Sequence, residues 1–228
     1  MEINWKEAQD MKCDKNYMLL YAVTDRSWLG NKTLETQVEE TLRGGATCIQ
    51  LREKDLEEEQ FIQEALKIKD LCLRYHVPFI INDNVEVAIK CGANGVHVGQ
   101  SDLNACEVRK LIGEDMILGV SVQTVEQAVQ AEKNGADYLG VGTVFTTSTK
   151  PDADFVSYEM LKAICKKVSV PVVAIGGINS ENILELQGSG IDGVALVSAI
   201  FASHNIEMES RKLLKLSESV VKNENKQY

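Results

Sequence analysis

The sequence lacks several features that mark specialised classes of protein. It has no apolar run near the roughly 20 residues that a membrane-spanning helix needs. Its first residues, MEINWKEAQDMKCDK, show neither the basic start nor the apolar core of a signal peptide. Basic residues are outnumbered by acidic ones, 24 to 34, which gives a formal net charge of −10. This charge argues against a general nucleic-acid-binding protein, which presents a basic face. We expect a cytoplasmic protein without nucleic-acid or membrane partners.

The cysteine pattern also lacks a recognisable site. None of the six cysteines forms a C-x-x-C pair with another, so zinc and thioredoxin-like interpretations have no support. Cys48, Cys72 and Cys165 lie among apolar neighbours, where a thiol behaves as a small hydrophobic group. We expect structural thiols in a reducing compartment.

What is present is an ordinary globular composition in a chain of 228 residues. Hydrophobic residues make up 44% and charged residues 25%, which excludes an extensively disordered chain. A single domain of this length buries enough apolar surface to be stable without disulfides or metal.

Short apolar runs alternate with segments of helical period. The runs that we expect to form strands cover residues 17–23, 46–51, 78–82, 95–98, 116–121, 137–141, 170–175 and 193–198. They are apolar almost throughout, as in parallel strands that are covered on both faces. Between the second and third runs, Phe61, Ala65, Ile68 and Cys72 repeat at helical spacing.

This alternation predicts an α/β fold, a (β/α)8 TIM barrel in a single domain. We place the catalytic barrel at residues 17–222, an N-terminal extension at 1–16 and a frayed tail at 223–228. The last helix is expected over 205–222.

Barrel enzymes act at the carboxyl ends of their strands, and cations gather there in this chain. Arg52 and Lys54 follow the second predicted strand, and Lys150 follows the sixth. A solvated strand end would also explain the first two. Three cations at one mouth of an acidic protein would repel one another, however, unless an anionic ligand binds there.

Two aspartates follow neighbouring strands. Taken singly, Asp83 and Asp102 are more often turn formers or helix caps. Together, beside the cations, they suit Mg²⁺, which takes one or two carboxylates and completes its shell with water and substrate phosphate.

Glycines after the seventh predicted strand suit a phosphate. Gly176 and Gly177 could form only a tight turn. They could also precede a helix that starts near residues 179–180, where backbone N–H groups would face the anion. Gly177 and Ser198 fall on the two loops that usually bind phosphate in this fold.

No nucleophile is evident, and His97 is expected to be a hydrogen-bonded core residue. A mouth rich in cations, donors and carboxylates favours electrostatic chemistry on a phosphorylated or diphosphorylated substrate.

Seven motifs complete the pattern: QLREKD at 50–55, IND at 81–83, GVHVGQSD at 95–102, GVS at 119–121, DYLGVGTVF at 137–145, TSTK at 147–150 and IGGI at 175–178. Their combination resembles the thiamine-phosphate synthase family over about residues 17–200. The resemblance implies a transferase that joins hydroxymethylpyrimidine diphosphate to hydroxyethylthiazole phosphate. It also implies Mg²⁺ and a dissociative reaction, in which diphosphate leaves before the thiazole nitrogen captures the pyrimidine methyl cation.

The resemblance carries the family's site residues onto this chain. It implies that the pyrimidine diphosphate is bound by Gln50, Leu51, Arg52, Glu53, Lys54 and Asn82. It also implies that Ser121 contacts the pyrimidine and that Lys150 contacts the diphosphate. The thiazole phosphate is implied to be bound by Thr147, Ser148, Thr149, Gly177, Val197 and Ser198. The metal ion is implied to be bound by Asp83 and Asp102. The residues implied to act in catalysis are Arg52, Lys54, Ser121 and Lys150.

The chain departs from the family at three positions. Thr143 and Thr146 replace prolines, so we expect a more mobile loop after the sixth strand. Asn84 replaces an arginine, so we expect weaker diphosphate binding.

Two other functions compete with the synthase. One is a thiazole tautomerase-like barrel, which needs no diphosphate or metal half. The other is a non-catalytic protein that binds thiazole phosphate or thiamine phosphate. The retained cations and aspartates favour the synthase, and the sequence leaves open whether the protein is a homo-oligomer.

Overall fold

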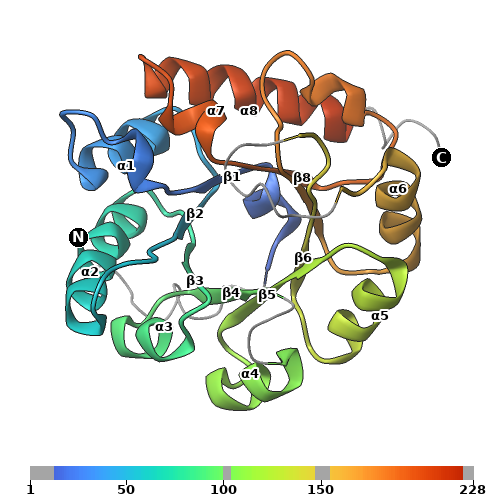
Figure 1. Ribbon diagram of the computed structural model, residues 1–228, viewed down its shortest axis with the longest axis horizontal. Helices are drawn as coiled ribbons and strands as arrows, with labels where there is room; N and C mark the ends of the chain where they lie inside the picture. The colour runs from blue at the N-terminus through green and yellow to red at the C-terminus, as the bar shows by residue number, and fades with distance from the viewer. Residues whose placement is uncertain (1–12, 100–103, 147–154, 223–228) are drawn as a thin grey trace.

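The computed structural model describes residues 13–99, 104–146 and 155–222. Eight parallel strands close into a barrel in chain order, and helices surround it (Figure 1). The predicted TIM barrel is confirmed. Within the described residues, no helix combines the length and apolarity that crossing a membrane requires.

All of the predicted strands are present, with boundaries within three residues of those expected. They are β1 (Leu20–Val23), β2 (Cys48–Leu51), β3 (Phe79–Asn82), β4 (Gly95–Val98), β5 (Ile117–Val122), β6 (Tyr138–Val141), β7 (Val172–Ile175) and β8 (Gly193–Leu196).

The helices fill the connections between the strands. The α-helices are α1 (Leu34–Arg43), α2 (Glu58–Arg74), α3 (Val85–Cys91), α4 (Ala105–Ile112), α5 (Val125–Lys133), α6 (Tyr158–Lys167), α7 (Ser198–Phe201) and α8 (Ile206–Lys222). Three short 3₁₀ helices are η1 (Lys15–Met18), η2 (Arg26–Trp28) and η3 (Ile183–Leu186). The helix expected at the carboxyl end of the barrel domain corresponds to α8.

The core has two layers because side chains alternate across each strand. One layer lies between the strands and the helices, and it includes Leu51 and the predicted apolar face of α2. The other fills the barrel interior, where Met18, Tyr21 and Tyr138 are buried. Side chains that face this interior near the carboxyl ends of the strands are therefore in position to line a site.

One local expectation at the carboxyl end of β7 was wrong. No helix begins at residues 179–180; the chain turns there and enters η3 only at Ile183. The N–H of Asn179 donates to the side chain of Asn182 at 2.8 Å, and the N–H of Glu181 donates to the side chain of Asn179 at 2.8 Å. Asparagine side chains that bond nearby backbone groups compete with helix formation, which explains the turn.

Candidate active site

The end of β2 supplies the largest group of predicted site residues, and their side chains alternate between two environments. Gln50 faces the barrel interior, is 5% exposed, and donates from Nε2 to the hydroxyl of Tyr21 at 2.8 Å. Leu51 packs outward against the helices. Leu51 is therefore positioned to meet a substrate only through its main chain.

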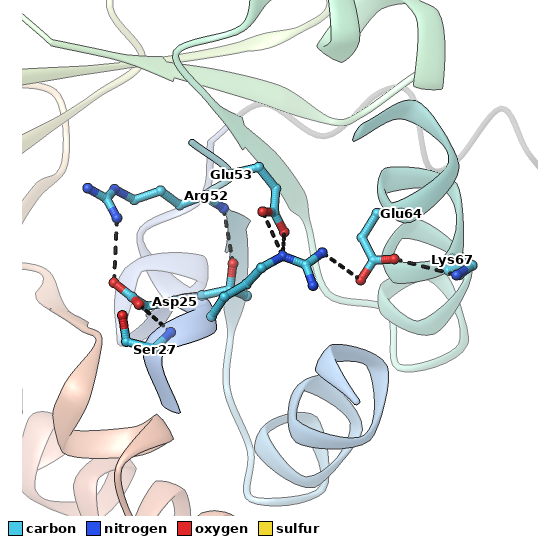
Figure 2. Close-up of polar contacts among 8 residues, drawn as sticks. Asp25, Ser27, Arg52, Glu53, Glu64 and Lys67 are labelled. Carbon is cyan, nitrogen blue, oxygen red and sulfur yellow. Dashed lines mark hydrogen bonds and ion pairs between the residues drawn. The ribbon is translucent and has the colours of Figure 1, made fainter. Parts of the chain in front are cut away.

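Arg52 is oriented by the end of β1. Its N–H donates to Thr24 Oγ1 at 3.0 Å, and its guanidinium lies 3.5 Å from the carboxylate of Asp25 (Figure 2). The Arg52 side chain is 19% exposed, whereas Lys54 is an exposed residue. Both cations follow β2 at the carboxyl mouth of the barrel, as the sequence predicted.

Glu53 has a different environment from its neighbours. Both of its carboxylate oxygens accept from Arg26 Nε, at 2.9 and 2.8 Å, and its side chain is only 3% exposed. Arg26 also contacts Glu64 of α2 at 3.3 Å, and Glu64 contacts Lys67 (Figure 2). Glu53 thus anchors the β2 loop to η2 and α2.

Asp25 and Arg26 were not among the predicted site residues. They follow β1, whereas the predicted site residues lie at or after the carboxyl ends of the other seven strands. A signal for them was present in the sequence, because an acidic and a basic residue stand together shortly after the apolar run of β1. Arg52 and Glu53 form the same kind of pair directly after β2.

Asp83 stands at the end of β3 with φ +61°, a backbone conformation that few residues other than glycine adopt. Its N–H donates to the carbonyl of His97 at 2.7 Å, and Asn82 Nδ2 donates to its carboxylate at 2.5 Å. Strained backbone of this kind often holds a functional group in place. The predicted role of Asp83 as a metal ligand stays a prediction.

Asn84, which replaces the family's arginine, has a structural role. Its side chain accepts a hydrogen bond from the N–H of Val87 at 2.9 Å and thereby caps α3. Asparagine is among the strongest N-cap residues. The expected effect on diphosphate binding stays a prediction.

Several predicted site residues lie outside the described residues: Asp102, Thr147, Ser148, Thr149 and Lys150. Their roles stay predictions. Among the residues that the structure describes, no group of three or more histidine, cysteine, aspartate or glutamate side chains could hold a metal ion.

The predicted thiazole-phosphate residues lie on the adjoining strands β7 and β8. Gly177 has φ +67°, and a Cβ added there would lie 2.4 Å from the carbonyl oxygen of Thr146, so only glycine fits. Val197 packs against the interior layer, and Ser198 is the first residue of α7. The structure brings these three residues to neighbouring strand ends.

The segment after β6 runs beside the Gly176–Gly177 turn. Val144 N–H donates to the carbonyl of Ile175, and Phe145 N–H to that of Gly176, both at 3.0 Å. Thr143 is buried, and its carbonyl accepts from Val156 N–H at 2.8 Å. The expected effect of Thr143 and Thr146 on loop mobility stays a prediction.

Ser121, on β5, belongs to a polar chain inside the barrel. Its hydroxyl lies 2.9 Å from His97 Nε2, and His97 Nδ1 lies 2.9 Å from the hydroxyl of Tyr138. The expected hydrogen bonding of His97 is confirmed, although the residue is half-buried rather than part of the core. Tyr21 and Tyr138 were not predicted, because both lie within apolar runs and carry no sequence signal beyond their inward register.

The sequence matches a known protein family and several of its members. The sequence model of a family described as thiamine monophosphate synthase matches residues 20–200. This chain belongs to that family. It is 52% identical over 206 residues to a thiamine-phosphate synthase of Ruminiclostridium cellulolyticum, and this match covers 90% of this chain and 98% of the relative. It is 50% identical over 194 residues to one of Clostridium botulinum, which covers 85% of this chain and 91% of that one.

A solved structure shows the same relationship in three dimensions. The thiamine phosphate pyrophosphorylase of Pyrococcus furiosus superposes with a TM-score of 0.84 at 37% identity, over 90% of this chain and 98% of that one. The family, the transferase class and the barrel that the motifs predicted are confirmed.

Proposed function

We propose that this protein condenses hydroxymethylpyrimidine diphosphate with hydroxyethylthiazole phosphate, releasing thiamine phosphate and diphosphate. The observation that carries the proposal is the 52% identity to a thiamine-phosphate synthase over 90% of the chain. The mouth of the barrel supports it, because a partly buried arginine, an aspartate and a glycine turn stand at the ends of β2, β3 and β7.

The proposed reaction breaks a bond before it forms one. The C–O bond to diphosphate breaks, and its electron pair leaves with the diphosphate, so the pyrimidine methylene becomes a cation. The thiazole nitrogen then donates its lone pair and forms the C–N bond. Arg52, Lys54 and Lys150 stabilise the negative charge that develops on the leaving group.

The second substrate must already be in place when the cation forms, because water would otherwise capture it. Gly177, Val197 and Ser198 are assigned to the phosphate of that substrate. Their strands lie across the barrel from β3 and β4, so the two substrates would meet over the interior side chains.

Members of this family use a metal ion, and we assign Mg²⁺ to this chain. Asp83 fits such an ion: it is a carboxylate at the carboxyl end of a strand, held in an unusual backbone conformation. Asp83 and Asp102 would hold the ion, which when bound supplies positive charge to the diphosphate. The proposal includes a location in the cytoplasm, since all six cysteines are free thiols.

The direct test is to incubate the purified protein with both substrates and Mg²⁺ and to measure thiamine phosphate and diphosphate. Equal amounts of the two products are expected, and none with EDTA. A protein that only isomerises a thiazole substrate would be the tautomerase instead. Tight binding of thiazole phosphate or thiamine phosphate without turnover would indicate the non-catalytic alternative.

A further inference from the structure

Two pairs of opposite charges join the segment after β1 to the segment after β2. The carboxylate of Asp25 lies 3.5 Å from the guanidinium of Arg52. Arg26 Nε donates to both carboxylate oxygens of Glu53, at 2.9 and 2.8 Å. The two strands pair in parallel, and their register continues into these segments. Because an acid precedes a base after β1 and a base precedes an acid after β2, each charge meets its opposite.

The carboxylate of Glu53 is enclosed, although the residue belongs to a segment at the mouth of the barrel. Its side chain is 3% exposed, whereas the residue as a whole is half-buried. The surface that Glu53 presents to solvent therefore belongs mainly to its main chain. Figure 2 shows Arg52 extending toward Asp25, whereas the side chain of Glu53 lies on the side of Glu64.

A carboxylate with so little exposure requires a compensating charge, because an unpaired ion is strongly disfavoured away from water. Arg26 supplies this charge. Its planar guanidinium presents five N–H donors and can contact two carboxylates at once. Its Nε donates to Glu53, and its Nη2 lies 3.3 Å from Glu64 on α2. Lys67 continues the network, at 3.4 Å from Glu64 and 3.3 Å from Glu35 on α1. The Glu53 carboxylate is thereby fixed to the outer helices.

This arrangement changes the charge that an anionic substrate meets at the end of β2. In sequence, Glu53 stands between the cations Arg52 and Lys54. A free carboxylate there would oppose one of the two cations and repel a diphosphate, and such repulsion is stronger near a protein surface than in bulk water. Pairing with Arg26 neutralises the carboxylate and directs it outward, so the end of β2 remains positive.

We propose that Arg26 is a positioning residue of the diphosphate site, which holds the Glu53 carboxylate against α2 and leaves the mouth at the end of β2 to the cations Arg52 and Lys54. The inference rests on the proposed function, because it deepens the role assigned there to these two cations. It gives the segment after β1 a part in substrate binding.

A double-variant cycle tests whether Arg26 acts through Glu53. Arg26→Gln removes the charge that holds the carboxylate, so the KM of the pyrimidine diphosphate is expected to rise about tenfold while the KM of the thiazole phosphate stays unchanged. Adding Glu53→Gln removes the carboxylate itself, and the KM of the double variant is expected to return to within about threefold of wild type. Arg43→Gln is the matched control, because it loses the same charge and an ion pair to Glu39 at the carboxyl end of α1, shortly before β2 begins.

Binding of the leaving group gives a second measurement, without turnover. In isothermal titration with diphosphate and Mg²⁺, Arg26→Gln is expected to bind about tenfold more weakly than wild type, and the double variant to recover most of this loss. Arg26→Lys keeps the charge but lacks the planar fork, so its affinity is expected to lie between those of wild type and Arg26→Gln. Should Arg26→Gln not fold, Arg26→Lys and the double variant decide the question.

Three results would overturn the proposal. An unchanged pyrimidine KM and diphosphate affinity in Arg26→Gln would show that Arg26 has no part in the site. A loss that Glu53→Gln does not restore would show that one of the two side chains contacts the substrate directly. Equal rises in both KM values would show a general effect on the fold. If wild-type protein makes no thiamine phosphate, the proposed function fails, and the diphosphate titration still decides the role of Arg26.

Discussion

The carboxylate of Asp25 joins the backbone of η2 to the guanidinium of Arg52. One of its oxygens accepts from Ser27 N–H at 2.8 Å, and the other lies 3.5 Å from Arg52 Nη1. The two charged side chains are 14% and 19% exposed, so each is largely held by its surroundings. Arg52 is thus oriented before an anionic substrate arrives.

Asp25→Asn tests this orientation. Asparagine keeps the acceptor for Ser27 N–H but removes the charge that holds the guanidinium. We expect the KM of the pyrimidine diphosphate to rise about fivefold, which corresponds to ~1 kcal/mol. Steady-state kinetics measure this KM, with Glu40→Gln as a control that removes the ion pair between Glu40 on α1 and Lys32. A lower KM would show that Asp25 competes with the substrate for Arg52.

Asp83→Asn separates the charge of this residue from its backbone conformation. Asparagine tolerates φ near +61° as aspartate does, so the free energy of unfolding should change little. We expect turnover to fall more than about tenfold and half-saturation to need more Mg²⁺. Rates measured across a Mg²⁺ series check this. A wild-type rate and metal requirement in the variant would show that Asp83 is not a ligand.

Gly119→Ala and Gly140→Ala form a graded pair. The first places a methyl group 2.2–2.5 Å from Tyr138 and His97, the second 3.1–3.5 Å from His97. Overpacking of a core typically costs ~1–3 kcal/mol, and we expect Gly119→Ala to fall in that range and Gly140→Ala to cost less. Urea unfolding of both variants measures the difference, and equal costs would contradict the contacts described.

Two serines on α8 should respond oppositely to loss of their hydroxyl. Ser210 Oγ is buried and has no hydrogen-bond partner among the described residues, so Ser210→Ala should leave stability unchanged or raise it by up to ~1 kcal/mol. Ser217 Oγ donates to the carbonyl of Leu19 at 2.5 Å, so Ser217→Ala should cost ~1–3 kcal/mol. Thermal unfolding of the two variants compares their stabilities. The reverse order would mean that Ser210 is hydrogen-bonded.

Stability should fall as the pH rises above about 9. Burial, together with the charges of Asp137, Asp14 and Asp192, raises the pKa of Cys13 to about 12 from 9.0. Between these two values the unfolded chain has lost the thiol proton and the folded chain has kept it, so raising the pH favours unfolding. Urea unfolding between pH 8 and 11 measures the slope. Cys13→Ala should reduce it, and an identical slope in the variant would contradict the burial of this thiol.

Periodicity and composition were sufficient for the architecture. Continuous apolar runs such as 170–175 indicated strands covered on both sides, and the spacing of Phe61, Ala65, Ile68 and Cys72 indicated the buried face of α2. Because the carboxyl ends of parallel strands meet at one rim, the sequence also placed Arg52, Asp83 and Gly177 at a common mouth. These inferences depend on burial and period, which are local properties of the chain.

Contacts between distant segments depended on the closed barrel. Tyr21 and Tyr138 are 117 positions apart and meet only because β1 and β6 face the same interior at the same height. Arg26 and Glu53 are 27 positions apart, and the hydrogen bond between them likewise depends on how β1 and β2 pair. The substrate-binding role of Glu53 stays a prediction. After β7, the hydrogen bond between Asn179 and Asn182 forms a turn where a helix was predicted.

The sequence by itself determined the barrel, the family and the strand ends at which the predicted site residues lie, since these follow from residue type and spacing along the chain. Only the tertiary structure decided which side chains at those strand ends face inward, and which partner orients each of them. The physical reason is that strand register and barrel closure set distances between residues far apart in the chain, and hydrogen-bond partners follow from those distances.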